Sequence, residues 1–205
     1  MQIIKILTIF FALCNVALAA DYSHPISSDH VLGDAASKVV VIVYSSLTCP
    51  HCATFYNNVF PLLRQNYIDN KKIAYVSRSM ITDQACMAAT MISYCKGEQN
   101  AHMMTMKFFE HYDTLIKPLL ISSGEAAMNQ YLSNLQNIAA LADISKDQFK
   151  VCLENTNLQD SLLKTQKSAS EQLEIKTIPF ILINGKKYEG AFTYEAISEE
   201  INKNL

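Results

Sequence analysis

The most constraining stretch of this chain is an apolar run that ends at two cysteines separated by two residues. Residues 39–44 are all apolar or aromatic and mostly β-branched, which predicts a buried strand. Cys49 and Cys52 follow, and Pro50 stands where its fixed φ suits the first turn of a helix. A helical pattern continues over residues 53–67. The sequence therefore places Cys49 at a strand-to-helix junction.

This junction predicts an unusual chemistry for the first cysteine. Its sulfur should lie near the unsatisfied N–H groups at the positive end of a helix, and a protonated His51 would add a second positive charge. We therefore expect Cys49 to be a stable thiolate and the nucleophile. Cys52, one turn further along, should be more buried and act as the resolving thiol. Because a stable thiolate favours the reduced dithiol, a Cys49–Cys52 disulfide would be a strong oxidant.

A metal site is the competing interpretation of two cysteines at this spacing. Zinc requires four ligands, and no second CxxC or Cys/His pair with suitable spacing is present in the sequence. A c-type haem site would need a histidine directly after Cys52, where the chain has Ala53. The redox interpretation is therefore favoured, with no metal expected.

Cys49-Pro50-His51-Cys52 resembles the active-site motif of the DsbA family, a branch of the thioredoxin superfamily. A second match, residues 176–185, is similar to the cis-proline loop of that family and the strand after it. Two further segments, 106–113 and 149–153, are similar to parts of its helical insertion. The resemblance implies an α/β, thioredoxin-like fold with a helical insertion. It divides the chain into a thioredoxin core (39–81 and 175–205) and an insertion (about 82–174).

The N-terminus has the pattern of a secretory signal peptide, residues 1–19. Lys5 precedes an apolar run over residues 6–14, and Ala17-Leu18-Ala19 fits the small-x-small cleavage rule. A lipoprotein signal through Cys14 is less favoured because bulky Leu13 precedes it. Cleavage near Ala19 predicts export to the periplasm, an oxidising compartment. Residues 20–205 would then be the mature DsbA-like domain.

The residue pattern beyond the motif agrees with this architecture. A second strand is expected at 73–77. Pro61 should kink the helix predicted over residues 53–67, or end the first half of that helix. Residues 82–174 show only helical patterns, in which Asp83 and Ser145 are plausible caps and Pro118 should break a helix. At the C-terminal end, a strand is expected over 180–183, a turn at Asn184-Gly185 and a second strand over 186–189. A helix over 194–204 follows, capped by Thr193.

The resemblance also implies roles for residues of the second match. Pro179 would be cis and lie beside the cysteines, and the backbone edge of Ile178 would bind an extended substrate segment. An ordinary trans proline at an edge strand is the alternative. Many relatives hold a buried acid six residues before the first cysteine, which carries protons for the buried thiol. Here that position is Val43, so Cys52 would depend on water, Tyr44 or another group.

Five of the six cysteines remain after removal of residues 1–19. The resemblance implies a structural disulfide between Cys95 and Cys152, which would stabilise the fold by about 4 kcal/mol. Cys86 is then the odd thiol, either a small buried residue or an alternative to Cys95 in that bridge. The methionines are interpreted as core residues, with a pliable docking surface or a copper site with His102 as alternatives.

Together these features predict an exported protein disulfide oxidoreductase, a dithiol oxidase that donates its disulfide to the thiols of unfolded secreted proteins. The resemblance implies reoxidation by a membrane partner of DsbB or VKOR type, with no cofactor beyond the redox-active disulfide. We expect a monomer, and a net charge of −2 gives no signal of nucleic-acid binding.

Two other functions remain open. The first is a disulfide isomerase or reductase, although residues 20–38 are too short for the dimerisation domain usual in isomerases of this superfamily. The second is a thioredoxin-fold copper chaperone.

Overall fold

A five-stranded sheet forms the centre of the computed structural model, which describes residues 20–205. The predicted signal peptide lies outside the described residues. The sheet order is β1-β3-β2-β4-β5, with β2 and β3 parallel and every other pair antiparallel. The strands are β1 (Val31–Gly33), β2 (Val40–Ser45), β3 (Ala74–Ser79), β4 (Phe180–Ile183) and β5 (Lys186–Lys187).

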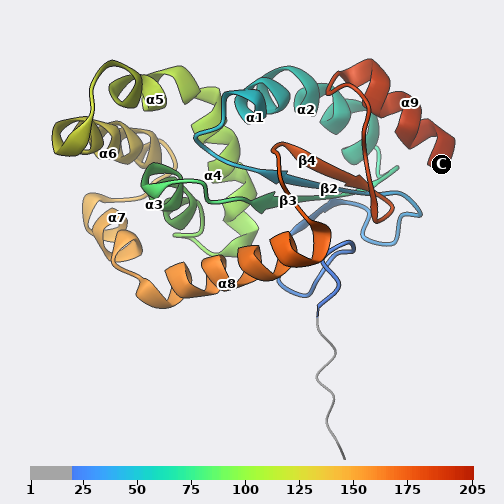
Figure 1. Ribbon diagram of the computed structural model, residues 1–205, viewed down its shortest axis with the longest axis horizontal. Helices are drawn as coiled ribbons and strands as arrows, with labels where there is room; N and C mark the ends of the chain where they lie inside the picture. The colour runs from blue at the N-terminus through green and yellow to red at the C-terminus, as the bar shows by residue number, and fades with distance from the viewer. Residues whose placement is uncertain (1–19) are drawn as a thin grey trace, which may run out of the picture.

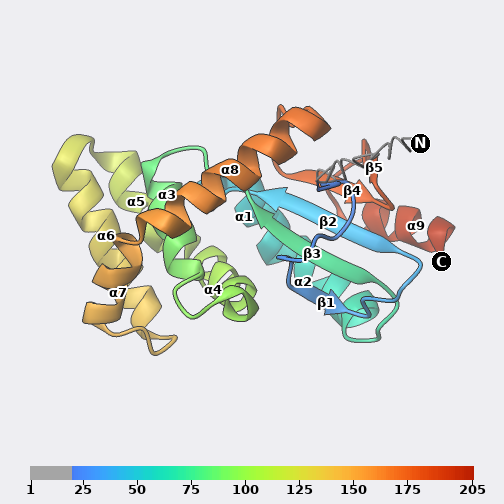
Figure 2. The same cartoon turned by 90° about the horizontal axis from the view of Figure 1, so that it is seen from below.

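Helices cover both faces of this sheet (Figures 1 and 2). One face carries α9 (Tyr194–Asn204) and a helical stretch made of α1 (Pro50–Thr54), η1 (Phe55–Val59), α2 (Phe60–Leu63) and η2 (Arg64–Ile68). On the other face lies α8 (Thr156–Leu173). The remaining helices gather at one end of the sheet, and they are α3 (Gln84–Ser93), α4 (Glu98–Glu110), α5 (Tyr112–Ile121), α6 (Gly124–Ala140) and α7 (Lys146–Leu153). The predicted α/β architecture with a helical insertion is therefore confirmed.

The alternation of side chains along β2 divides the core between these two layers. Val41 and Val43 belong to the large apolar cluster with the α1–α2 stretch, α9 and the insertion. Ile42 and Tyr44 belong to a smaller cluster that includes Ala169 of α8. Because successive strand residues point to opposite faces, a wholly apolar strand requires cover on both sides.

Pro61 lies within the helical stretch without ending it. The turn η1 (Phe55–Val59) has π-helical geometry, and the N–H of Phe60 bonds to the Phe55 carbonyl five residues earlier. A proline has no N–H to donate, and this wider turn shifts the hydrogen-bond register by one residue just before it. The helical course therefore continues to Ile68.

The prediction that Pro118 breaks a helix is wrong. The break occurs at His111, between α4 and α5, where φ is −103° and ψ is 21°, and Pro118 lies inside α5. Proline cannot donate to the carbonyl four residues earlier, which is that of Thr114. The side-chain amide of Asn134, from α6, donates to this carbonyl at 2.8 Å. A neighbouring helix thus replaces the missing bond, and the proline is tolerated.

Local signals at the other element ends are confirmed, apart from the length of the last strand. Asp83, Ser145 and Thr193 each accept a backbone N–H at the start of their helices, and Ser145 forms a full capping box with Gln148. The turn after β4 has positive φ at both of its central residues, 49° and 75°. The strand after it, β5, ends at Lys187 rather than at residue 189.

The insertion contains the disulfide that the resemblance implies. Cys95, just after α3, is joined to Cys152 of α7, with 5.5 Å between the two Cα atoms. Cys86 is free and fully buried in the first turn of α3, so the alternative pairing does not occur. The bridge closes a loop that contains α4, α5 and α6.

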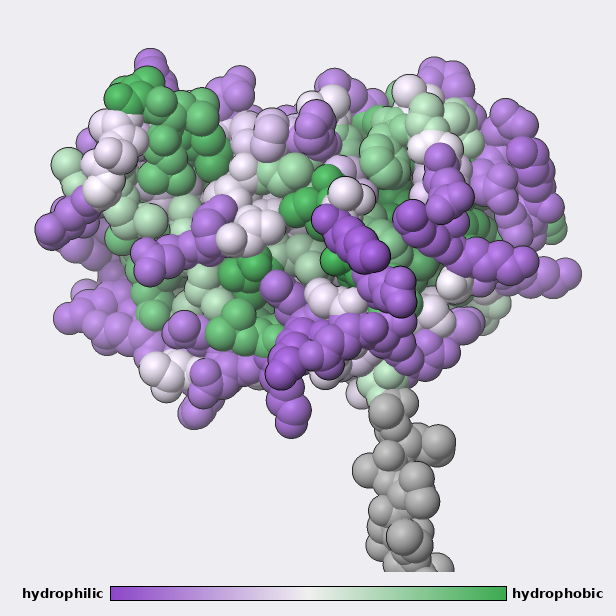
Figure 3. Space-filling view, in the orientation of Figure 1, coloured by the Kyte–Doolittle hydropathy of each residue, from purple (hydrophilic) through white to green (hydrophobic). Residues whose placement is uncertain are grey.

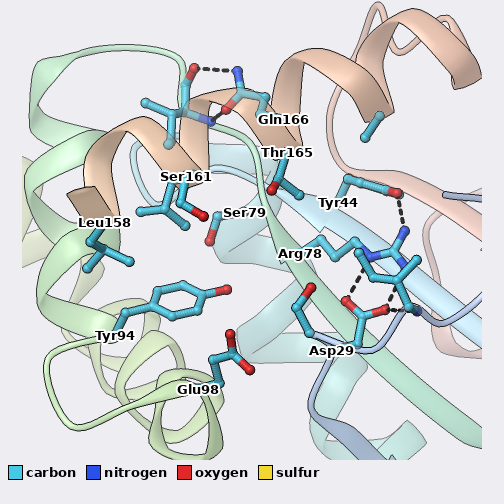
Figure 4. Close-up of a pocket in the computed structure, with 15 residues that line it drawn as sticks. Asp29, Tyr44, Arg78, Ser79, Tyr94, Glu98, Leu158, Ser161, Thr165 and Gln166 are labelled. Atoms are coloured by element: carbon cyan, nitrogen blue, oxygen red, sulfur yellow. Dashed lines mark hydrogen bonds and ion pairs between the residues drawn. The ribbon is translucent and has the colours of Figure 1, made fainter. Parts of the chain in front are cut away.

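A buried ion pair attaches the N-terminal segment, residues 20–30, to the sheet (Figure 4). Arg78 of β3 and Asp29 form a bidentate pair at 3.0 and 2.6 Å, and both side chains are 7% exposed. The remaining guanidinium donors bind the carbonyls of Tyr22 and His24 and the hydroxyl of Tyr44. All five N–H groups of Arg78 are therefore used.

The adjacent cavity, shown in Figure 4, has a volume of about 100 Å³ and lies against α8. With no free donor, Arg78 cannot also bind an anion there. We interpret Arg78 as a structural group.

Most large apolar side chains are buried, with a few exceptions on the surface. Leu120 and Ile121, at the end of α5, are 78% and 72% exposed. Apolar side chains also gather over this end of the molecule in Figure 3.

None of the helices within residues 20–205 has the length and apolar character needed to cross a membrane.

The double substitution Cys95→Ala and Cys152→Ala should lower the free energy of unfolding by about 4 kcal/mol. Without the bridge, the unfolded chain regains the conformational entropy that a cross-link between residues 57 positions apart removes. Denaturant unfolding under oxidising conditions measures the loss. In strong reductant the variant and the wild type should unfold at similar denaturant concentrations. Equal stability of the two proteins without reductant would contradict the prediction.

Asp29→Ala should cost about 3–5 kcal/mol of stability, because it leaves the Arg78 guanidinium buried without its counter-charge. The matched control is Glu199→Ala, which removes one of the two carboxylates paired with the exposed Lys203 and should cost less than about 1 kcal/mol. Urea unfolding of both variants provides the comparison. A cost for Asp29→Ala as small as that of the control would show that the pair does not hold the N-terminal segment.

Candidate active site

Cys49 lies where the sequence predicts, between β2 and α1. It is the N-cap residue of α1, with extended φ and ψ of −87° and 121°, and Pro50 is the first helical residue. Cys49 is half-buried, whereas Cys52 is fully buried in the large apolar cluster. Both thiols are free in this structure. An attacking group can therefore reach Cys49 but not Cys52.

The surroundings of Cys52 oppose its ionisation. Burial raises the pKa of the Cys52 thiol far above its ordinary value, and the charge of Cys49 adds to the increase. A backbone hydrogen bond from Ser46 acts in the opposite direction without cancelling it. Cys52 is therefore a protonated thiol at neutral pH whenever it is not in a disulfide. The predicted thiolate at Cys49 and the electrostatic role of His51, which is exposed, stay predictions.

The second motif lies directly beside the first. The Ile178–Pro179 peptide bond is cis, and the Cys49 sulfur donates to the Ile178 carbonyl at 3.8 Å. This contact joins residues 129 positions apart. The sheet explains it, because β4 pairs with β2 and Phe180 lies opposite Tyr44. The loop before β4 must then pass the loop after β2.

The helical insertion holds the loop that precedes Cys49. The hydroxyl of Tyr112, from α5, donates to the Thr48 carbonyl at 2.9 Å. The hydroxyl of Thr48 donates to the carboxylate of Asp83, the N-cap of α3, at 2.6 Å. Burial raises the pKa of Tyr112 to about 12, and the charge of Cys49 adds to that increase, so the phenol stays a donor. The sequence identifies Asp83 only as a cap and gives no signal for Tyr112.

A buried serine connects this loop to the third free thiol. Ser46 is fully buried, and its hydroxyl lies 3.1 Å from the sulfur of Cys86 and 2.8 Å from the hydroxyl of Thr82. The sequence leaves Cys86 as an odd thiol with no place in the site. The fold brings it to the loop because α3 starts just after β3, next to the end of β2.

Val43 is fully buried and apolar, as the sequence indicates, and it lies between Ser77 and Ile181 on the neighbouring strands. Tyr44 points to the opposite face, where its hydroxyl contacts Tyr22 and Arg78. Tyr44 therefore cannot exchange protons with Cys52, and that alternative is wrong.

The structure gives little support to the copper alternative. His102 packs against the rings of Phe60 and Tyr75, and neither of its ring nitrogens has a hydrogen-bond partner. Burial lowers the pKa of His102 to about 4, which keeps the ring neutral. Within residues 20–205, no group of three or more His, Cys, Asp or Glu side chains is arranged to hold a metal ion.

Comparison with known proteins agrees with this geometry. The family model described as thioredoxin matches residues 26–203. The chain belongs to the thioredoxin family. Among solved structures of the family, α-DsbA1 of Wolbachia pipientis superposes with a TM-score of 0.74 at 28% identity, over 88% of this chain and 92% of that one. The predicted DsbA-like form of the thioredoxin fold is thus confirmed.

Other members of the thioredoxin family extend the comparison. Proteins of Rickettsia bellii and Rickettsia conorii, both named for protein-disulfide oxidoreductase activity, are 31% and 32% identical to this chain over 86% and 87% of it. The chain spans only 64% and 61% of the length of these relatives. A protein-disulfide isomerase of Novosphingobium aromaticivorans shares the fold, with a TM-score of 0.77 at 21% identity over 86% of this chain and 96% of that one.

The difference in burial between the thiols predicts their order of reaction with an alkylating reagent. In the reduced native protein, Cys49 should react at least about tenfold faster than Cys52 or Cys86, because both of these are fully buried. Quenched labelling with iodoacetamide followed by peptide mass mapping measures the three rates. In denaturant the three should become similar, and native labelling of Cys52 as fast as that of Cys49 would contradict the assignment.

Proposed function

We propose that this protein is a thiol:disulfide oxidoreductase that works as a dithiol oxidase on exported proteins. The observation that carries the proposal is the unequal pair of thiols beside a cis-proline loop. Cys49 is accessible at a helix N-terminus, and Cys52, one turn away, is buried. A disulfide between them would have one sulfur open to attack and one protected.

In the proposed reaction, a substrate thiolate attacks the sulfur of Cys49 in the Cys49–Cys52 disulfide. A mixed disulfide forms at Cys49, and Cys52 leaves and takes a proton, as its burial requires. A second substrate thiolate then attacks the substrate sulfur, and Cys49 is released as the leaving group. The substrate is oxidised by two electrons and the protein dithiol is reduced. Stabilisation of the departing Cys49 thiolate by α1 and His51 favours this direction.

The loop of the second motif supplies a site for the substrate chain. Ile178 is half-buried, its carbonyl faces Cys49, and its aliphatic side chain packs against the core. An extended substrate segment would pair with this backbone next to the reacting sulfur. Such pairing uses main-chain groups and therefore accepts many sequences, as an oxidase of diverse unfolded proteins requires.

The setting of this activity completes the proposal. Cleavage of the signal peptide near Ala19 would release the domain to the periplasm, where a membrane partner of DsbB or VKOR type would reoxidise it. The Cys95–Cys152 disulfide supports an oxidising compartment, since such bridges are rare in reducing ones. We propose a monomer that needs no cofactor other than its own disulfide.

An isomerase or reductase is the alternative that the sequence leaves open. Two assays of the mature protein separate the functions. A dithiol oxidase should rapidly oxidise a reduced, unfolded substrate and poorly rescue one with scrambled disulfides.

The Cys49→Ala variant should lose oxidation, and Cys52→Ala should trap a mixed disulfide with substrate. Strong rescue of the scrambled substrate with weak oxidation of the reduced one would overturn the proposed direction.

A further inference from the structure

The buried thiol has a proton to move in every cycle, and neither the buried acid of many relatives nor Tyr44 is available for it. Position 43 carries a valine, and Tyr44 lies on the opposite face of the sheet. Burial holds the Cys52 thiol in its protonated form, so its proton must leave before the sulfur can attack. Water or another polar group must then connect Cys52 with solvent.

A chain of hydroxyl groups leads from the neighbourhood of Cys52 to the surface. It begins at Ser46, which is fully buried and whose backbone hydrogen bond lowers the pKa of the Cys52 thiol against the larger effect of burial. The Ser46 hydroxyl lies 2.8 Å from that of Thr82 and 3.1 Å from that of Thr48. These two donate to one carboxylate oxygen of Asp83, at 3.1 and 2.6 Å.

The two branches of this chain start and end at the same groups. Thr48 and Thr82 offer parallel routes, and they also lie within 3.1 Å of each other. Both branches meet Ser46 on the inner side, and both donate to Asp83 on the outer side. Asp83 is exposed, so its carboxylate is in contact with water. Its other oxygen accepts the N–H of Cys86, which fixes its orientation.

Resting on the proposed function, we propose that Ser46 and Asp83 form the proton path of Cys52. The hydroxyl of Ser46 contacts the Cys86 sulfur in this structure, and in the proposed path it turns from Cys86 to Cys52. It accepts the Cys52 proton while passing its own proton through Thr82 or Thr48 to the Asp83 carboxylate. The same hydroxyl chain works in reverse when Cys52 leaves a disulfide and needs a proton.

Other titratable groups surround this path and differ from Asp83 in chemistry. The thiols Cys49 and Cys86 and the phenols Tyr56, Tyr75 and Tyr112 all interact electrostatically with Cys52. Tyr112 and Tyr131 also interact with the charge of Asp83. Burial raises the pKa of each of these phenols. These phenols therefore stay protonated near neutral pH.

A second set of buried hydroxyls is the rival path. Tyr56, one helical turn after Cys52, bonds to Ser77 at 2.6 Å and to Tyr75 at 3.2 Å. This cluster lies between η1 and β3 and does not include a carboxylate. The Ser46 chain is favoured because the backbone of Ser46 acts on the Cys52 thiol and because the chain ends at an exposed acid.

Glutathione disulfide is the probe for the test, with the reduced mature protein. In the first step the Cys49 thiolate attacks one sulfur, which forms a Cys49–glutathione disulfide and releases a glutathione thiolate. In the second step Cys52 loses its proton along the path and attacks the Cys49 sulfur. The mixed disulfide breaks, a second glutathione thiolate leaves, and the Cys49–Cys52 disulfide forms. Two electrons pass from the protein to glutathione disulfide.

Acid-quenched mass spectrometry follows both steps in each variant. In Ser46→Ala and Asp83→Asn the second step should slow at least about tenfold, and the mixed disulfide should accumulate. The first step should stay within about twofold of the wild type, because the path does not serve Cys49. Asparagine retains the N-cap function at the start of α3, so Asp83→Asn tests the ionisable group rather than the helix start. Asp83→Glu should restore the second step in part.

Two further variants serve as controls. Ser93→Ala removes a buried hydroxyl of α3 that bonds only within the insertion, and its second step should match the wild type. Tyr56→Phe tests the rival path and should also match. The proposal is overturned if Ser46→Ala and Asp83→Asn resolve the mixed disulfide as fast as the wild type. It is also overturned if Tyr56→Phe alone accumulates it, or if both steps slow equally.

The same experiment separates this proposal from the proposed function. A wild-type protein that forms no Cys49–Cys52 disulfide with glutathione disulfide would refute the thiol chemistry itself. A wild type that forms it, with variants that do so equally fast, would refute the proton path alone.

Discussion

The antiparallel pairing of β2 with β4 is the constraint on which the site depends. β2 leads directly to Cys49, and β4 follows directly after Pro179. Because Phe180 lies opposite Tyr44, the loop after β2 and the loop before β4 must meet at the same end of these two strands. A slip of one residue would move each side chain of β4 from the apolar core that it fills to the core on the opposite face. The packing of the sheet therefore also fixes the position of the cis-proline loop next to the reactive sulfur.

The helical insertion contributes to this site as well as enlarging the domain. The active-site loop has polar contacts with two of its helices, through Asp83 at the start of α3 and Tyr112 at the start of α5. It also brings Cys86 to the back of the loop. A thioredoxin core without this insertion would have to hold the loop and move the Cys52 proton by other groups.

The two faces of β2 separate the structural and the chemical parts of the molecule. On the face that carries Val43, the core contains Cys52 and the buried hydroxyl groups near it. On the face that carries Tyr44, the hydroxyl of this tyrosine takes part in the Arg78–Asp29 cluster that holds the N-terminal segment. The alternation of a strand assigns adjacent residues to different tasks. For this reason Tyr44, although next to Val43 in the sequence, takes no part in the chemistry of Cys52.

The sequence by itself determined the order of elements, the two motifs, the helix caps at Asp83, Ser145 and Thr193, and the burial of residues 39–44. These features follow from local periodicity, from backbone preferences and from side chains that bond within a few residues of themselves. The tertiary structure decided that Pro118 stays helical, because Asn134 of another helix satisfies the Thr114 carbonyl. It also decided that Ser46, Asp83 and Cys86 meet behind the active-site loop. Contacts between residues tens of positions apart depend on how strands and helices pack, and no local pattern encodes that packing.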